Sequence, residues 1–345
     1  MTRPQRAVIL PTPGDPYINS LWLSSYKKKW FSEVDKLYIC LNSGMDPKIL
    51  NYTKSLYDNL GCQVILFNHC IGHGKAIQHC LEIVEEENVL LLEDDFYILQ
   101  SGQVNRLFEI VEKGFAQAVV SSRASCCQGL HQRIVDKFNL TGQEALVPNF
   151  WPCLFLSNKS HLLDTDQWFD SVNYEKGKYI PELDWTFDKN QSGDTFVGIS
   201  IQLRNKKLRF HYEPQYRNTT DDLFLYDKKQ GMFAEQLPWT HFGSSSNGLM
   251  GTLLDKTNRP LGNYKRSAPL ELPDTSDLHI KEDIERRVSL WDLCFQHFPI
   301  LNLECCYFND IYSGAINKLI DECSLSREKI QTFKTIYREV LETIL

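Results

Sequence analysis

Short apolar runs alternate with amphipathic segments through the first 125 residues, and this alternation is the strongest constraint on the fold. Apolar runs of four to seven residues predict strands, and apolar residues recurring every three or four positions predict helices. The predicted strands are 7–10, 36–42, 62–68, 88–93 and 118–122, and the predicted helices are 18–31, 46–61, 74–87 and 101–114. This alternation predicts an α/β fold with a mostly parallel sheet, and the absence of polar alternation within the strands predicts helices on both faces.

The pattern changes in the second half of the chain. Further predicted strands are residues 153–157, 196–201 and 208–212. The segment 257–277 contains three prolines. Helical spacing of apolar residues then returns in three stripes that start at Ile284, Phe308 and Ile330. We therefore expect an α/β domain over 1–256, a linker or extended arm over 257–277 and a helical C-terminal region over 278–345.

Charge and cysteine content narrow the class of protein. The net charge of −7 weighs against a nucleic-acid partner, although residues 201–270 carry eleven Lys and Arg against six Asp and Glu. No apolar run approaches the roughly 20 residues of a membrane span, and the N-terminal apolar run is too short for a signal peptide. Eleven cysteines without C-x-x-C spacing predict reduced, mostly buried thiols. We expect a cytoplasmic protein.

The segment VLLLEDDFYIL, residues 89–99, places three adjacent carboxylates directly after a strand. Like charges repel, so Glu93, Asp94 and Asp95 either project into water at a strand end or hold a cation. Ligands bind beyond the carboxyl ends of parallel strands, which favours the second interpretation. Oxygen ligands of this kind suit Mg²⁺ or Mn²⁺, often bound together with substrate phosphates.

A second candidate is GHGKAI, where Gly72 and Gly74 precede a predicted helix. Backbone N–H groups at a helix start bind phosphates, and His73 and Lys75 are placed to contact a base or a diphosphate. The segment has neither the G-x-G-x-x-G nor the P-loop spacing. A plain helix-start turn is the alternative.

A third candidate is IPELDWTFD, residues 180–188. Glu182 and Asp184 lie beside Trp185, and a carboxylate next to an indole is suited to act as a general base next to a sugar. A surface loop with solvated acids and one anchoring tryptophan is the alternative.

A fourth candidate is the glycine- and serine-rich stretch 239–251, WTHFGSSSNGLMG. It suits a loop that wraps a ligand and donates hydrogen bonds to phosphates around His241. The alternative is a linker, against which the aromatic residues of the stretch argue.

In this order the motifs resemble the GT-A fold of nucleotide-sugar glycosyltransferases. The pattern is similar to the inverting N-acetylglucosaminyltransferase I type, which has an E-D-D motif after an apolar strand, a D-W pair and a glycine-rich F-G loop. The matching positions here are Pro11-Thr12, Glu93-Asp94-Asp95, Asp184-Trp185, and Phe242-Gly243 leading to Gly248 and Gly251. The glycine spacing differs from the family's, and the helical tail has no counterpart in the resemblance.

The resemblance implies a role for each motif. Asp95 would bind Mn²⁺ or Mg²⁺, and Asp94 the ribose or the sugar. Glu93 or Pro11-Thr12 would lie next to the base, and Gly243 would belong to the loop over the donor. Asp184 would take the proton from an acceptor hydroxyl in an inverting transfer. His241 would be a second metal or phosphate contact.

Several functions remain open at this level. The leading hypothesis is a metal-dependent transferase with a nucleotide-sugar donor, expected to be UDP-linked, and with a glycan, protein, small molecule or modified DNA as acceptor. Transfer to hydroxylated DNA bases finds support only in the basic stretch 201–270. A nucleotidyltransferase would show a glycine-rich signature after the first strand, which LPTPGDPY lacks. A non-catalytic nucleotide-sugar-binding or scaffold protein is the alternative from another class.

Overall fold

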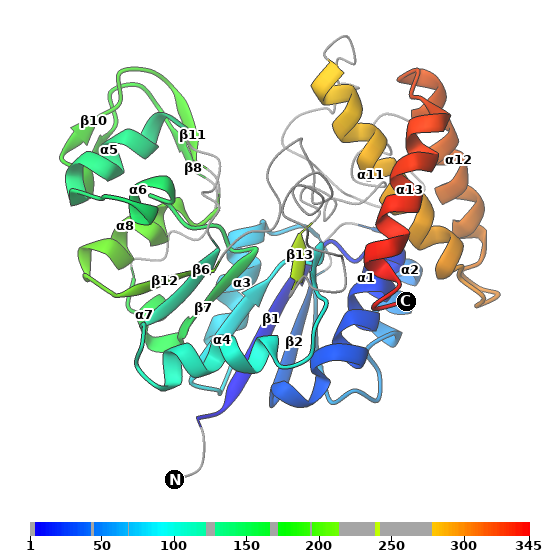
Figure 1. The fold of residues 1–345 in the computed structure, drawn as a ribbon, viewed down its shortest axis with the longest axis horizontal. Helices are drawn as coiled ribbons and strands as arrows, with labels where there is room; N and C mark the ends of the chain where they lie inside the picture. Colours follow the sequence, from blue (N-terminus) through cyan, green and yellow to red (C-terminus); the bar gives the residue numbers. More distant parts are fainter. Residues whose placement is uncertain are drawn as a thin grey trace.

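A seven-stranded sheet forms the centre of the computed structural model (Figure 1). The structure describes residues 4–42, 45–67, 69–121, 128–165, 172–193, 195–213, 239–241 and 278–345. The strands, in their order across the sheet, are β12 (Phe210–Glu213), β6 (Ala118–Ser121), β7 (Leu154–Asn158), β4 (Asn88–Leu92), β1 (Arg6–Thr12), β2 (Lys36–Asn42) and β3 (Gln63–Phe67). Six strands run in one direction, and β7 runs antiparallel to its neighbours β4 and β6.

Helices cover both faces of the sheet. Neighbouring residues of a strand point to opposite faces, so an apolar strand presents apolar side chains to both of them. Val8 and Leu10 of β1 face one apolar cluster, and Ala7 and Ile9 face the other. The first face carries α1 (Pro16–Ser25), α2 (Pro47–Ser55) and α4 (Gln103–Glu112). The second carries α3 (His73–Ile83), α7 (Lys159–Leu163) and α8 (Val197–Asn205). The predicted α/β class is confirmed, and double coverage explains why the strands lack polar alternation.

Smaller elements gather on one side of the sheet, at the left of Figure 1. They are α5 (Gln128–Phe138), α6 (Gln143–Leu146), β8 (Val172–Tyr174), β9 (Tyr179–Ile180), η3 (Pro181–Leu183), β10 (Trp185–Thr186) and β11 (Gln191–Gly193). The strands form two antiparallel pairs, β9 with β10 and β8 with β11. A third apolar cluster joins α5, the β9–β10 hairpin and α8.

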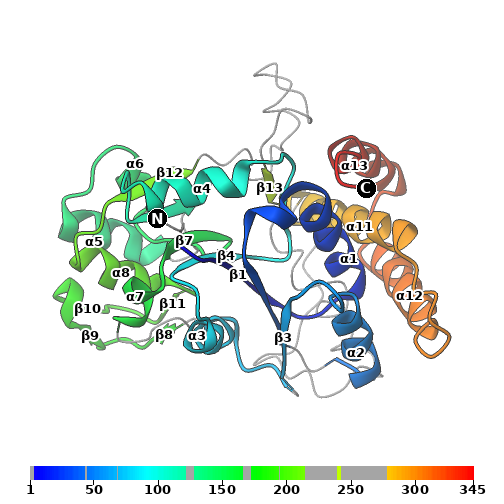
Figure 2. The same cartoon turned by 90° about the horizontal axis from the view of Figure 1, so that it is seen from below.

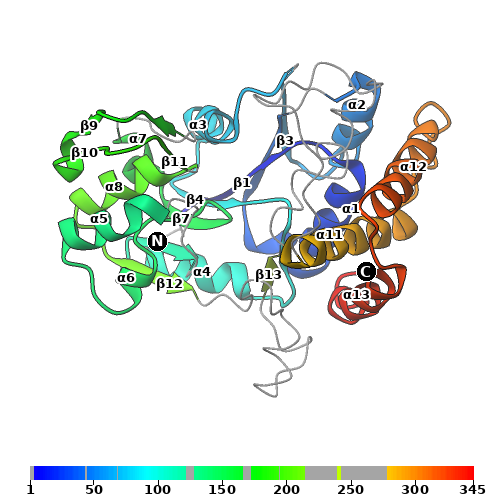
Figure 3. The ribbon, with the colours of Figure 1, turned by 90° about the horizontal axis from the view of Figure 1, so that it is seen from above.

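The predicted helical C-terminal region is confirmed as α11 (Leu278–His297), α12 (Tyr307–Glu322) and α13 (Arg327–Leu341). These helices lie on the opposite side of the molecule from α5 and β10, as Figures 2 and 3 show. Tyr17 of α1 packs on Phe295 and Tyr312, with ring centroids 5.6 and 4.2 Å apart. The helices therefore share one apolar core with the sheet. No helix in the described part of the chain is long and apolar enough to span a membrane.

The predicted strand 196–201 is wrong, because residues 197–201 form the start of α8 and Phe196 is the residue that precedes this helix. Val197 and Ile201 pack into the third cluster, whereas Ile199 and Leu203 pack against the sheet. A helix buried on two sides has no polar face, so its short apolar run has the pattern of a buried strand.

Other predicted boundaries shift. The first strand runs on through Pro11 to Thr12, which pair with β2. The helix predicted over 18–31 ends at Ser25 and is followed by the short π-helix η1 (Tyr26–Trp30) and the 3₁₀ turn η2 (Phe31–Glu33). The predicted cap of α2 is confirmed, since the carboxylate of Asp46 accepts a hydrogen bond from the Lys48 N–H at 2.7 Å. The predicted linker 257–277 lies outside the described residues.

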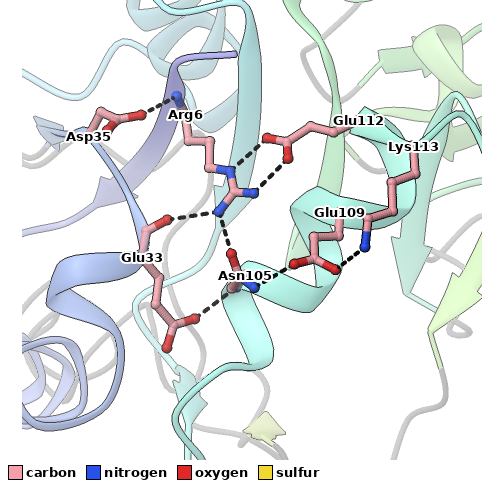
Figure 4. A network of polar contacts seen from close by, with 7 residues as sticks. All are labelled: Arg6, Glu33, Asp35, Asn105, Glu109, Glu112 and Lys113. Carbon is pink, nitrogen blue, oxygen red and sulfur yellow. Dashed lines mark hydrogen bonds and ion pairs between the residues drawn. The ribbon is translucent and has the colours of Figure 1, made fainter. Parts of the chain in front are cut away.

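A buried ion pair ties the start of β1 to α4 (Figure 4). The Arg6 guanidinium donates two hydrogen bonds of 2.6 Å to Glu112 and one of 2.7 Å to the Asn105 amide oxygen. The Arg6 Cζ atom lies over the Phe108 ring, 5.0 Å from the ring centroid. The backbone N–H of Arg6 donates to Asp35 at 2.9 Å. These contacts fix the amino end of the central strand, whose other end reaches the candidate site.

Candidate functional site

The site lies where the strand order of the sheet reverses. From β1 the chain moves outward to β2 and β3, and then returns to place β4 on the other side of β1. The carboxyl ends of β1 and β4 therefore lie side by side at a topological switch point, where open α/β sheets bind their ligands. Thr12 ends β1, and Glu93, Asp94 and Asp95 follow β4 directly.

The three carboxylates form a buried turn. The Phe96 N–H donates to the Glu93 carbonyl at 3.1 Å and closes the turn before the short strand β5 (Phe96–Ile98). Asp94 and Asp95 are 0% exposed, and Glu93, at 7%, accepts a hydrogen bond from the Trp151 indole at 3.1 Å. A solvated acidic turn is thereby excluded, and the buried charges need a compensating group.

The environment of Asp94 disfavours its charged form. Burial raises the pKa of its carboxyl well above the usual 3.8, and the neighbouring Asp95 raises it further. A hydrogen bond of 2.5 Å from the Thr12 hydroxyl to Asp94 Oδ2 acts in the opposite direction. Within the described part of the chain, Asp94 Oδ1 has no hydrogen-bond partner. That oxygen is therefore available to a ligand.

His241 reaches this turn from a distant part of the sequence. The strand β13 (Trp239–His241) pairs antiparallel with β5, and His241 stands opposite Phe96, the residue after Asp95. Trp239 is fully buried, stacks on Phe96 with centroids 4.6 Å apart, and its indole donates to Glu213 at 3.5 Å. The backbone register thus brings the predicted metal contact next to the carboxylate turn.

The predicted phosphate-binding segment begins α3 at the same edge of the sheet. Gly72 precedes the helix with a φ of 98°, a conformation that favours glycine, and no side chain caps the helix start. The Asn42 amide, at the end of β2, donates to the Gly72 carbonyl at 2.9 Å and accepts from the Ile71 N–H at 2.8 Å. Gly74 is buried, His73 half-buried and Lys75 exposed.

The predicted catalytic residues Glu182 and Asp184 lie elsewhere, in the β9–β10 hairpin. Asp184 is exposed, adopts a left-handed φ of 49°, and accepts a hydrogen bond from the Tyr179 hydroxyl at 2.7 Å. Trp185 is half-buried, with Arg133 5.1 Å from its ring centroid. This hairpin stands apart from β13 in Figures 1 to 3, so the structure does not bring it against the carboxylates.

The remaining predicted site residue, Gly243, lies outside the described residues, as do 214–238 and 242–270 of the basic stretch. Pro11 is buried in β1 beside Thr12. Sequence reasoning missed Asp15, which caps α1 by accepting from the N–H groups of Tyr17 and Ile18 at 2.9 and 3.1 Å. The signal was present, because Asp15-Pro16 repeats the Asp-Pro pattern that correctly predicted the cap of α2.

The chemistry of the turn suits a hard divalent cation. Carboxylate oxygens are the ligands that Mg²⁺ and Mn²⁺ prefer, and Asp94 Oδ1 is a buried acceptor without a hydrogen bond in the described part. Across the described ranges, no three His, Cys, Asp or Glu side chains form a ready-made cluster for a metal ion.

No family model matches the chain, and no curated protein is similar to it in sequence. Solved structures with partial likeness include a mannosyltransferase from Pyrobaculum calidifontis in complex with GDP-Man and Mn²⁺, 10% identical, with a TM-score of 0.43 over 100% of this chain and 86% of that one. Another is glucosyl-3-phosphoglycerate synthase from Mycobacterium tuberculosis in complex with Mn²⁺, UDP-Glc and glycerol 3-phosphate, 15% identical, with a TM-score of 0.35. That match covers 47% of this chain and 59% of the synthase. Both TM-scores lie below 0.5.

Proposed function

We propose that this chain is a metal-dependent glycosyltransferase that uses a nucleotide-sugar donor, with a UDP-linked sugar as the expected class. The observation that carries the proposal is the buried carboxylate turn after β4, joined to the end of β1 at the switch point of the sheet. Two adjacent buried carboxylates are stabilised by a divalent cation, and a nucleoside diphosphate supplies the oxygen ligands that complete its coordination.

Each part of this edge has a proposed role. Asp95 binds Mn²⁺ or Mg²⁺, with His241 as a second contact, and Asp94 holds the ribose or the sugar. The metal supplies positive charge that offsets the charge developing on the diphosphate leaving group. Pro11, Thr12 and Glu93 border the base.

The start of α3 supports phosphate binding. Because Gly72 gives no side-chain cap, the first backbone N–H groups of the helix remain available for an anion, and the helix dipole favours negative charge there. The helix α1 differs, since Asp15 occupies its start. The diphosphate is therefore expected toward His73, Gly74 and Lys75 rather than at α1.

Asp184 is proposed as the general base that deprotonates the acceptor hydroxyl in an inverting transfer, as in N-acetylglucosaminyltransferase I-type enzymes. Its exposure suits contact with an acceptor, and the Tyr179 hydroxyl orients the carboxylate. Glu182 and Trp185 border the same surface. Because the hairpin stands apart from β13, the acceptor would have to bridge the two, or the hairpin would have to approach the donor.

Ligand-induced stabilisation tests the donor site. Mn²⁺ together with a nucleoside diphosphate should raise the melting temperature of the wild type, because a ligand that binds only the folded state stabilises it. Asp95→Asn should lose this shift. The matched control is Asp164→Asn, since Asp164 is an exposed aspartate paired with Lys206 and should leave the shift intact. Absence of any metal-dependent shift across UDP, GDP, ADP, CDP and dTDP would contradict the proposal.

A further inference from the structure

A chain of buried polar side chains runs behind the carboxylate turn. The Tyr57 hydroxyl donates to the Asn19 amide oxygen at 2.6 Å, Asn19 donates to the Thr12 hydroxyl at 2.9 Å, and Thr12 donates to Asp94 at 2.5 Å. None of the four is more than 2% exposed. The chain links α1 and the turn after α2 to the switch point of the sheet.

The direction of these hydrogen bonds is fixed by neighbouring backbone groups that can only accept or only donate a hydrogen bond. The Asp15 carbonyl can only accept, so the Asn19 Nδ2 atom must face it, at 2.8 Å. The second N–H of that amide then points at the Thr12 hydroxyl, which also accepts from the Gly14 N–H at 3.1 Å. With both lone pairs of the hydroxyl used, its single proton must go to Asp94 Oδ2.

Gly14 belongs to this arrangement. Its φ of 87° is one that favours glycine, and a Cβ there would approach the Leu50 Cδ2 atom to 2.8 Å. The turn that delivers the Gly14 N–H to Thr12 therefore depends on glycine. Four buried polar groups in one core are costly unless every hydrogen bond is made. Apolar residues of the same shape would stabilise this core as well, so stability alone does not account for the chain.

We propose that Asn19, supported by Tyr57, is a positioning residue that acts through Thr12 to hold Asp94 in one orientation, with Oδ2 engaged and Oδ1 turned to the ligand. The inference rests on the proposed function and changes one role in it, because it gives Asp94 Oδ1 to the cation, beside Asp95, and not to the ribose or the sugar. Outer partners of this kind keep a carboxylate ready for its ligand, so that no ordering is needed when the ligand binds.

Metal affinity measured apart from turnover tests the chain. Mn²⁺ alone, and then Mn²⁺ with UDP, is titrated calorimetrically into the wild type, Asn19→Leu, Thr12→Val, the double variant and Thr12→Ser. Asn19→Leu and Thr12→Val should each weaken Mn²⁺ binding by roughly tenfold. Thr12→Ser keeps the hydroxyl and should stay within about twofold of the wild type. The double variant should bind like Thr12→Val alone, because Asn19 acts only through Thr12.

Ser25→Ala is the matched control, because Ser25 lies on the same helix and donates a buried hydrogen bond of 2.7 Å to the Ile98 carbonyl. It should lower the melting temperature without metal and leave Mn²⁺ affinity unchanged. If Asn19→Leu behaves in the same way, or if the losses from Asn19→Leu and Thr12→Val add in the double variant, the positioning role is overturned.

Two further outcomes can be distinguished from a failure of the positioning role alone. If the wild type binds no Mn²⁺ with or without UDP, the proposed function fails, and the positioning role fails with it. If Asn19→Leu does not fold, Tyr57→Phe decides. It removes the support of the amide and should weaken Mn²⁺ binding by about threefold. Unchanged affinity in that variant would contradict the chain.

Discussion

The carboxylate of Asp15 shows at the scale of a single residue how burial sets a pH response. It caps α1 from a fully buried position, and burial raises its pKa from 3.8 to about 6, with the hydrogen bonds from Ile18 and Tyr17 opposing the shift. Between these two values the folded state binds more protons than the unfolded state, so the free energy of unfolding falls as pH rises from about 4 to about 6.

Asp15→Asn should remove this loss of stability, because an amide oxygen still caps the helix and carries no charge. The variant should exceed the wild type at pH 7.5 by about 2 kcal/mol in free energy of unfolding, and the difference should vanish near pH 4. Urea denaturation at the two pH values measures both effects. Parallel stability profiles for the two proteins would show that Asp15 is not the group that titrates.

At the scale of elements, the Arg6 ion pair joins β1 to α4 in a nearly buried setting, with side-chain exposures of 3% for Arg6 and 11% for Glu112. Arg6→Met should cost about 3 kcal/mol in urea denaturation, because Glu112 is then left without its counter-charge. Arg6→Met combined with Glu112→Leu should recover most of that loss.

The matched control for this pair is also drawn in Figure 4. Lys113 pairs with Glu109 at 2.6 Å, but both side chains are exposed, so Lys113→Met should change stability by less than about 0.5 kcal/mol. Equal effects of Arg6→Met and Lys113→Met would mean that the buried pair does not anchor the central strand.

The elements also mark the limit of what the sequence predicts. Continuous apolar runs predict β1, β2 and β4, because a doubly covered strand needs no polar positions. The same logic fails for α8, which is buried on two sides and so lacks the helical period. Helix caps depend on neighbouring residues and can be predicted from the sequence, as the cap of α2 at Asp46 demonstrates. The cap of α1 at Asp15 was not predicted, although the same Asp-Pro pattern is present there.

At the scale of the whole molecule, local sequence patterns do not predict which strands from distant parts of the chain pair with one another. The insertion of the antiparallel β7 between β4 and β6, and the pairing of β13 with β5, depend on contacts between distant segments. The sequence predicted that the carboxylates follow a buried strand. It did not predict that Thr12, Asn19 and Tyr57 would converge on Asp94, because that requires the ends of β1 and β4 to be neighbours.

The architecture places the candidate site between two structured sides. The β9–β10 hairpin lies on one side of the sheet and α11 to α13 lie on the other, as Figures 1 and 2 show. Tyr17 carries contacts from the C-terminal helices to α1, the helix that also holds Asn19. The C-terminal helices are therefore packed against α1, which supports the carboxylate turn through Asn19, and are not merely an appendage of the sheet.

Metal-dependent release of nucleoside diphosphate from a panel of nucleotide sugars measures the proposed donor chemistry itself. The wild type should release the diphosphate from one donor class with Mn²⁺ and lose this activity with a chelator. Asp95→Asn should reduce release by at least about a hundredfold. Asp184→Asn should keep donor binding and lose transfer to an acceptor. A wild type that cleaves no nucleotide sugar with any divalent metal, or an Asp95→Asn variant as active as the wild type, would contradict the proposed metal-dependent glycosyltransferase function.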